Sequence, residues 1–115
     1  MIYTSESIEK TVELFSSLPT IGRKTAQRLV FHLLRQPESF VEAFSKSLTE
    51  LKKNVKYCSK CFNYTEQDPC RICSSPKRDT SIICVVEEPN DVTAVEKTSE
   101  YYGLYHVLHG TLNPL

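Results

Sequence analysis

Four of the five cysteines lie in one short segment as two Cys-x-x-Cys pairs: Cys58 with Cys61, and Cys70 with Cys73. Two such pairs, eight residues apart, bring four thiolates to where a tetrahedral Zn²⁺ ion binds them. Two disulfides would need an oxidising compartment, and a redox-active Cys-x-x-Cys normally occurs once, at the start of a helix. The spacing therefore predicts one zinc ion per chain. Its role is structural, because four protein ligands leave no position open for substrate.

Length and charge limit what surrounds this segment. A chain of 115 residues forms one ordinary domain, or two or three small modules that need help, such as zinc, to stay folded. The formal net charge is zero, but residues 1–56 hold nine Lys and Arg against six Asp and Glu, whereas residues 82–115 hold one against five. No segment is long and apolar enough to span a membrane, and the N-terminus lacks the pattern of a signal peptide. Together with reduced thiols, this predicts a cytoplasmic protein.

Apolar periodicity predicts three helices before the cysteines. The first covers about residues 5–18 and the second about 23–35, with Pro19 and Gly22 bracketing a tight turn between them. The third covers about 38–53 and carries a continuous apolar stripe. We expect this stripe to be buried against the first two helices or against a second chain, so that dimers form.

The second helix begins in a basic stretch. No acidic residue lies between Glu13 and Glu38, whereas Arg23, Lys24 and Arg28 follow the turn. Basic side chains beside the unsatisfied N–H groups of a helix N-terminus are an arrangement that binds phosphate. The alternative is an ordinary solvated helix face.

The stretch from Leu18 to Leu29, LPTIGRKTAQRL, resembles the helix-hairpin-helix module, an apolar residue followed by Pro-Gly-Ile-Gly-[Arg/Lys]-x-x-Ala. In that module small residues let the hairpin backbone approach a DNA phosphate, and such contacts fix position without reading sequence. The resemblance implies DNA contacts at Thr20, Ile21, Gly22, Arg23, Lys24 and Arg28. Thr20 stands where the module usually has its first glycine; if this position needs a positive φ, a β-branched residue is strained there.

The segment after the cysteines has a different pattern. Residues 82–86 form a largely β-branched run, which predicts a strand buried on both faces of a parallel sheet. A helix is predicted for 89–98 and a second strand for 104–108, giving a β-α-β unit in which Cys84 is a buried apolar residue. Within the cysteine segment itself, we expect residues 62–69 to form a short hairpin.

The first predicted strand ends in Val86-Glu87-Glu88-Pro89-Asn90-Asp91, which resembles the first motif of a Toprim domain. Toprim enzymes hold Mg²⁺ with such a glutamate and an Asp-x-Asp pair from a later strand, and this sequence contains no Asp-x-Asp. The acidic residues are equally suited to a protein-docking surface. We expect no catalytic role for His106 or His109, because neither has an identifiable nucleophile or metal partner.

In order and in motifs, the chain resembles the RecR family of bacterial recombination mediators. The matching segments are LPTIGRKTAQRL, the four-cysteine segment from Tyr57 to Cys73, SPKRD, ICVVEEP and YHVLHG. The resemblance implies an α+β, multi-module fold. Its expected parts are a helix-hairpin-helix domain over 1–56, a four-cysteine zinc finger over 57–80, and the N-terminal part of a Toprim domain over 81–115, as in an N-terminal fragment of such a protein.

The same resemblance implies a function without enzymatic activity. Proteins of this family form dimers and ring-shaped tetramers that encircle DNA. With RecO or RecF they help RecA to load onto strands coated by single-stranded-DNA-binding protein. By this resemblance Glu87, Glu88 and Asp91 lie on the side that meets partner proteins. Two alternatives remain: a zinc-stapled oligomerisation module, and a fragment of a Toprim nuclease or primase.

Overall fold

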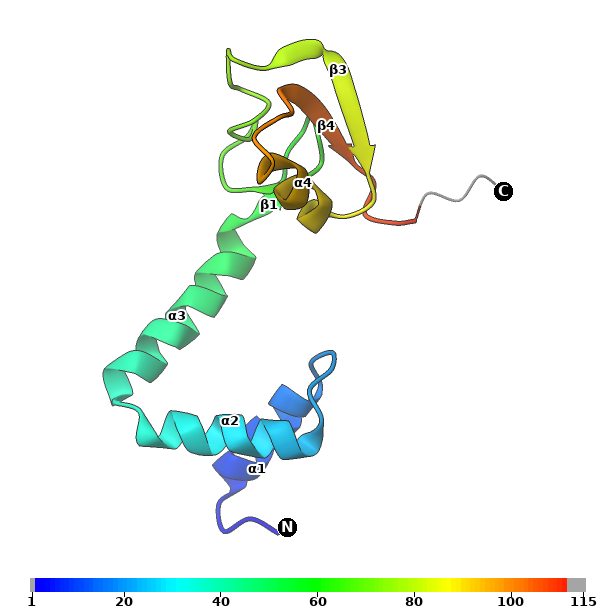
Figure 1. Cartoon of the computed structure of the whole chain (residues 1–115). Helices are drawn as coiled ribbons and strands as arrows, with labels where there is room; N and C mark the ends of the chain where they lie inside the picture. Colours follow the sequence, from blue (N-terminus) through cyan, green and yellow to red (C-terminus); the bar gives the residue numbers. More distant parts are fainter. Residues whose placement is uncertain (1, 112–115) are drawn as a thin grey trace. The chain divides into compact units, whose positions relative to one another are not determined.

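The computed structural model describes residues 2–111. In chain order these residues form three helices, two short strands, and a strand-helix-strand unit (Figure 1). The chain divides into two compact units, Met1–Thr49 and Glu50–Leu115, which are described separately below. Among the described residues, no helix is long and apolar enough to cross a membrane.

The first unit is built around the pairing of α1 (Glu6–Ser16) with α2 (Arg23–Arg35). Ser5 caps α1, because its hydroxyl accepts a hydrogen bond from the N–H of Ile8 at 3.4 Å. One stripe of each helix faces the other, and the buried core between them consists of Val12, Ala26 and Val30. The two predicted helices are therefore confirmed, the first slightly shorter than expected.

The third helix, α3 (Glu38–Asn54), has no buried residue. Its apolar stripe is exposed along its length, with Phe44 at 44% and Leu48 at 55%, and the rings of Phe40 and Phe44 lie 6.3 Å apart. Of the two partners expected for this stripe, the first two helices do not bury it, because the core between α1 and α2 includes no residue of α3. Burial against a second chain stays a prediction. Part of α3 instead borders an open apolar groove of about 520 Å³, which is lined mainly by Leu14, Phe15, Leu18, Leu33, Val41, Phe44 and Leu48.

The second unit begins with two short antiparallel strands, β1 (Lys56–Tyr57) and β2 (Tyr64–Thr65). Tyr57 pairs with Tyr64, and their rings stack at 5.3 Å. The predicted hairpin over 62–69 was misplaced. The first cysteine pair instead lies in the turn between the two strands, so this hairpin turn carries two of the four thiols.

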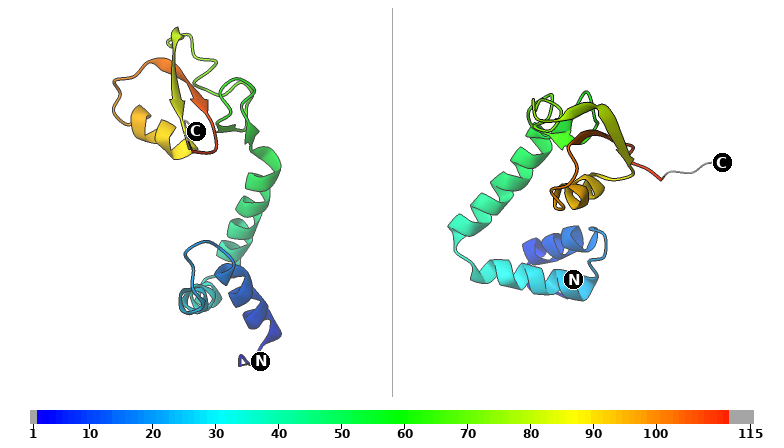
Figure 2. Two further views of the ribbon diagram at one scale, coloured as in Figure 1. Left: turned by 90° about the vertical axis from the view of Figure 1, so that its right-hand side faces the viewer. Right: turned by 45° about the horizontal axis from the view of Figure 1, so that its top comes forward.

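The strand-helix-strand unit consists of β3 (Asp79–Val86), α4 (Pro89–Glu96) and β4 (Gly103–Val107), with the two strands parallel. Figures 1 and 2 show α4 beside the two strands. Its core is formed by Val86, Val92, Tyr105 and Val107, with half-buried Cys84 packed against them. The predicted β-α-β unit is confirmed.

The expected burial of β3 on both faces was wrong. Ile83 is 60% exposed and Val85 is 48% exposed, whereas β4 alternates between buried and half-buried residues. Among the described residues β3 pairs only with β4, and α4 covers the face that carries Val86. An apolar run predicts which element is a strand, but not how many neighbours cover it.

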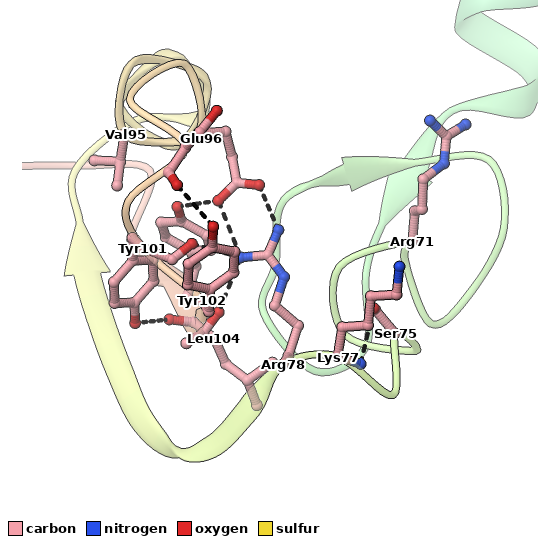
Figure 3. A network of polar contacts seen from close by, with 12 residues as sticks. Arg71, Ser75, Lys77, Arg78, Val95, Glu96, Tyr101, Tyr102 and Leu104 are labelled. Carbon is pink, nitrogen blue, oxygen red and sulfur yellow. Dashed lines mark hydrogen bonds and ion pairs between the residues drawn. The ribbon is translucent and has the colours of Figure 1, made fainter.

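A half-buried arginine joins the start of β3 to the end of α4 (Figure 3). Arg78 donates hydrogen bonds to the Glu96 carboxylate and to the carbonyls of Tyr101 and Gly103, the last two at 3.3 Å. The hydroxyl of Tyr105 donates to the same carboxylate. Gly103 is tightly enclosed here: a Cβ atom would overlap the phenol of Tyr101 and approach the carbonyl oxygen of Ile82 to 2.9 Å.

Candidate zinc centre and nucleic-acid interface

The four cysteines of the two Cys-x-x-Cys pairs form one cluster. Their Sγ atoms all lie within 4.8 Å of one another, and Cys61 Sγ lies 3.7 Å from Cys70 Sγ. A tetrahedral zinc ion with bonds of about 2.3 Å places its sulfur ligands about 3.8 Å apart, so the cluster fits zinc. A disulfide needs about 2.05 Å, and all five cysteines are free thiols.

Backbone N–H groups point at the sulfur atoms. Cys70 donates to Cys58 Sγ at 3.3 Å, Cys73 to Cys70 Sγ at 3.4 Å, and Asn63 to Cys61 Sγ at 3.5 Å. Hydrogen bonds of this kind favour the thiolate over the thiol. The backbone of this segment therefore directs N–H groups toward sulfur atoms of the proposed metal ligands.

The pKa values of the thiols differ, and some of the thiols would need a bound cation to become thiolates at neutral pH. Burial opposes ionisation of Cys58, but the N–H groups of Cys61, Cys70 and Lys60 lower its pKa to about 6. Burial raises the pKa of Cys61 to about 11, and also raises that of Cys73. The thiols of Cys61 and Cys73 therefore resist ionisation, whereas a bound cation deprotonates its thiol ligands.

Three of the four cysteines, Cys58, Cys61 and Cys70, are buried and Cys73 is half-buried, so protein surrounds the cluster. It is the one group of three or more His, Cys, Asp or Glu side chains within residues 2–111 that is arranged to hold a metal. Cys84 lies on β3 against a separate core. The four cysteines selected by the spacing are the four that the structure brings together, and their role as zinc ligands stays a prediction.

The predicted DNA-binding residues come together at the turn between α1 and α2. Thr20, at its tip, has φ of +64°, whereas Gly22 is the extended N-cap of α2. The positive φ anticipated at position 20 is therefore present. The first N–H groups of a helix have no intrahelical partner. Gly22 has no side chain that could cap those of α2, and no side-chain cap hydrogen bond is present.

The basic side chains extend this surface along α2. Lys24 and Arg28 are exposed and, four residues apart, share one helix face. Arg23 is also exposed but lies 3.8 Å from the carboxylate of Glu9, so its charge is partly balanced. Ile21 is half-buried and packs against the α1–α2 core. The polar and basic members of the predicted set are thus accessible, whereas Ile21 positions the turn.

The predicted acidic set lies at the end of β3 and the start of α4. The N–H of Glu88 donates to the Asp91 carboxylate at 3.0 Å, so Asp91 also caps α4. The carbonyl of Glu87 accepts from Gly110 N–H at 3.3 Å. All three acidic residues are exposed or half-buried.

Two histidines of the YHVLHG segment, for which no catalytic role was expected, contact residues beside the first cysteine pair. The His109 ring lies 4.7 Å from that of Tyr57, and its Nε2 is hydrogen-bonded to the carbonyl of Phe62. The ring of His106 packs edge-on against that of Phe62 at 5.5 Å. Both histidines have structural contacts, and no spacing rule in the sequence indicates which partners they find.

Family models match three successive parts of the chain. The RecR helix-hairpin-helix model matches residues 8–52, the RecR zinc finger model, for a domain with four cysteine ligands, matches residues 55–75, and the Toprim domain model matches residues 81–115. These matches follow the order of the turn, the cysteine cluster and the strand-helix-strand unit.

Curated relatives give the same result. The chain is 52% identical over 109 residues to "Recombination protein RecR" of Clostridium perfringens, covering 95% of this chain and 55% of the relative. It is 53% identical over 117 residues to the protein of that name from Chloroherpeton thalassium, covering 100% and 57%. With that from Bacteroides fragilis it shares 56% identity over 113 residues, covering 98% and 55%. The chain thus spans little more than half the length of these relatives, and it belongs to the RecR family of recombination proteins.

Proposed function

We propose that this chain is a non-enzymatic DNA-binding part of a cytoplasmic recombination mediator. The observation that carries this proposal is the turn between α1 and α2, where a glycine N-cap, uncapped N–H groups and the exposed side chains of Lys24 and Arg28 lie together. Such a surface neutralises and hydrogen-bonds phosphate oxygens. It touches no base edge, so binding is independent of sequence.

The four cysteines bind one structural zinc ion in this proposal. Zinc there supplies folding free energy to a segment whose own buried residues are mainly the ligands themselves. In the same proposal the acidic end of β3, with Glu87, Glu88 and Asp91, contacts RecO or RecF during loading of RecA on single-stranded DNA. The charge of this end suits a basic partner surface.

A second candidate function is assembly alone, and the exposed apolar stripe of α3 favours it. In a zinc-stapled module that only associates through this stripe, the basic turn would have no role in binding. A Toprim nuclease or primase fragment is distinguished by a direct assay for Mg²⁺-dependent cleavage or synthesis, for which Glu87 would be the acidic residue.

The deciding experiment is fluorescence anisotropy of the zinc-loaded chain on labelled single- and double-stranded DNA across a salt series. We expect log affinity to fall linearly with log salt concentration, with a slope of several units. Lys24→Ala and Arg28→Ala should each weaken binding on every sequence and lower the slope by about 1.

Lys10→Ala is the matched control, because Lys10 is exposed on α1 outside the turn. Its binding should equal that of the unsubstituted chain. If the Lys24→Ala, Arg28→Ala double variant bound DNA as tightly as the unsubstituted chain, the proposed interface would be contradicted and the assembly module favoured.

A further inference from the structure

The cysteine cluster is attached to the end of β4 through the backbone of one of its own members. The carbonyl of Cys61 accepts a hydrogen bond from Val107 N–H at 2.8 Å. Val107 is the last residue of β4 and is 2% exposed, so this bond is shielded from water. The position of a metal-ligating residue and the position of a strand end are therefore tied directly.

Phe62, the next residue, makes two further links. Its φ of +65° turns the chain back after Cys61, its ring packs against His106, and its carbonyl oxygen is hydrogen-bonded to His109 Nε2. Tyr57 and Tyr64, from the strands that enclose the first cysteine pair, place their rings 4.7 and 5.3 Å from that of His109.

The apolar packing is also continuous. Ile72, inside the second Cys-x-x-Cys, packs against the buried cysteines and against the core that contains Val107. One side chain thus belongs to both clusters.

Beyond Val107 the chain connects to the acidic end of β3. Leu108 N–H donates to the carbonyl of Val86 at 2.9 Å, and Gly110 N–H donates to that of Glu87 at 3.3 Å. Residues 107–110 therefore lie between the cysteine cluster on one side and the start of the acidic set on the other.

We infer that zinc binding by the four cysteines is thermodynamically linked to the order of residues 107–110 and, through them, of the acidic end of β3. A bound ion fixes the position of Cys61. It thereby also fixes the carbonyl oxygens of Cys61 and Phe62, to which Val107 and His109 are hydrogen-bonded. Without the ion, the finger has little buried apolar surface of its own to hold these acceptors in place. Linkage is reciprocal, so loosening the strand end weakens zinc binding by the same factor. The inference rests on the zinc site of the proposed function and does not depend on DNA binding.

The first test is amide hydrogen exchange on the full chain, zinc-loaded and after removal of zinc by a chelator under reducing conditions. We expect protection of Val107 and Gly110 to fall by roughly 5- to 150-fold, the usual range for coupled sites. The helices α1 and α2 lie in the other compact unit and serve as the internal control. Unchanged protection at Val107 would overturn the inference, and so would an equal loss throughout β3 and β4, which would mean that the whole unit unfolds together.

The second test is reciprocity. His109→Asn removes the imidazole but keeps a residue that tolerates the positive φ of 56° at this position, and His106→Ala removes the ring that faces Phe62. The double variant should lower zinc affinity, measured by competition with a chromogenic chelator. His32→Asn, at an exposed position on α2, should leave zinc affinity unchanged. Unchanged zinc affinity in the double variant, with Val107 exchange accelerated, would contradict the linkage.

Discussion

Thr20 combines two features that rarely occur together, a β-branched side chain and a φ of +64°. In that region Cβ crowds the following carbonyl, at a cost of roughly 1–2 kcal/mol for an L-residue. The neighbouring Gly22, which has no such need, is extended. The turn therefore holds a strained residue at the tip of the surface proposed to meet DNA.

Thr20→Gly should raise the free energy of unfolding of the helical unit by about 1 kcal/mol, because relief of strain exceeds the extra entropy of glycine in the unfolded chain. Chemical unfolding followed by circular dichroism at helical wavelengths measures this. Thr20→Asn should give a smaller gain, since asparagine tolerates positive φ. A loss of stability in the glycine variant would show that the side chain of Thr20 contributes more than its strain costs.

Residue types and spacing were sufficient to predict the metal cluster, because four thiols in two short turns have few other stable arrangements. For Thr20 it was the resemblance to the helix-hairpin-helix module that raised the question of strain, which would follow only from a positive φ, and the structure shows that φ. Residue types and spacing gave no indication of the contacts that Arg78 makes. Its partial burial depends on Glu96, eighteen residues further along the chain, and such a pairing leaves no local signal.

At the scale of elements, the pair of Arg78 and Glu96 fastens the start of β3 to the end of α4. The hydrogen bonds from Arg78 lower the pKa of Glu96, although burial acts in the opposite direction. A carboxyl group whose pKa is lower in the folded state stabilises the fold above its unfolded pKa. That contribution is lost as pH falls through its folded pKa.

Glu96→Gln should therefore destabilise the second unit at neutral pH, by about 1–3 kcal/mol. The difference from the unsubstituted chain should shrink as pH falls from neutral into the range below the ordinary pKa of a glutamate carboxyl. Urea unfolding at several pH values checks this, with Glu100→Gln, at an exposed neighbouring position, as the control for general charge effects. A difference that stays constant across this range would rule out titration of Glu96 as its source.

The elements themselves were predicted well, and their surroundings less well. The local apolar pattern located α1 and α2 by its periodicity and β3 by its β-branched run, because such a pattern is a local property of the sequence. It failed for the environment of β3 and of α3, whose apolar residues are largely exposed. What covers an apolar face depends on distant segments or on other chains, and the spacing of residues within one element does not identify these.

At the scale of the whole molecule, α3 exposes an apolar stripe beside an apolar groove of about 520 Å³. Burial of such side chains drives association. The proposed self-association into dimers or tetramers therefore has an available surface, although each chain folds its α1–α2 core alone.

Phe44→Glu should weaken self-association at least tenfold in dissociation constant, because burying one phenylalanine contributes about 1.5–3 kcal/mol and a buried carboxylate opposes contact. Sedimentation velocity over a concentration series measures this. Thr49→Glu adds the same charge on another part of the helix surface and should have little effect. Identical sedimentation of the two variants would exclude the stripe as the contact.

The enclosure of Gly103 restricts how this sequence can vary over evolutionary time. The phenol of Tyr101 and the backbone of Ile82 occupy the space of any side chain at this position, whereas the surroundings of Gly22 and Gly110 are open. A mutation at position 103 would need a prior change at Tyr101, and even then the Ile82 carbonyl would remain, so drift should preserve this glycine long after Gly110 has been replaced.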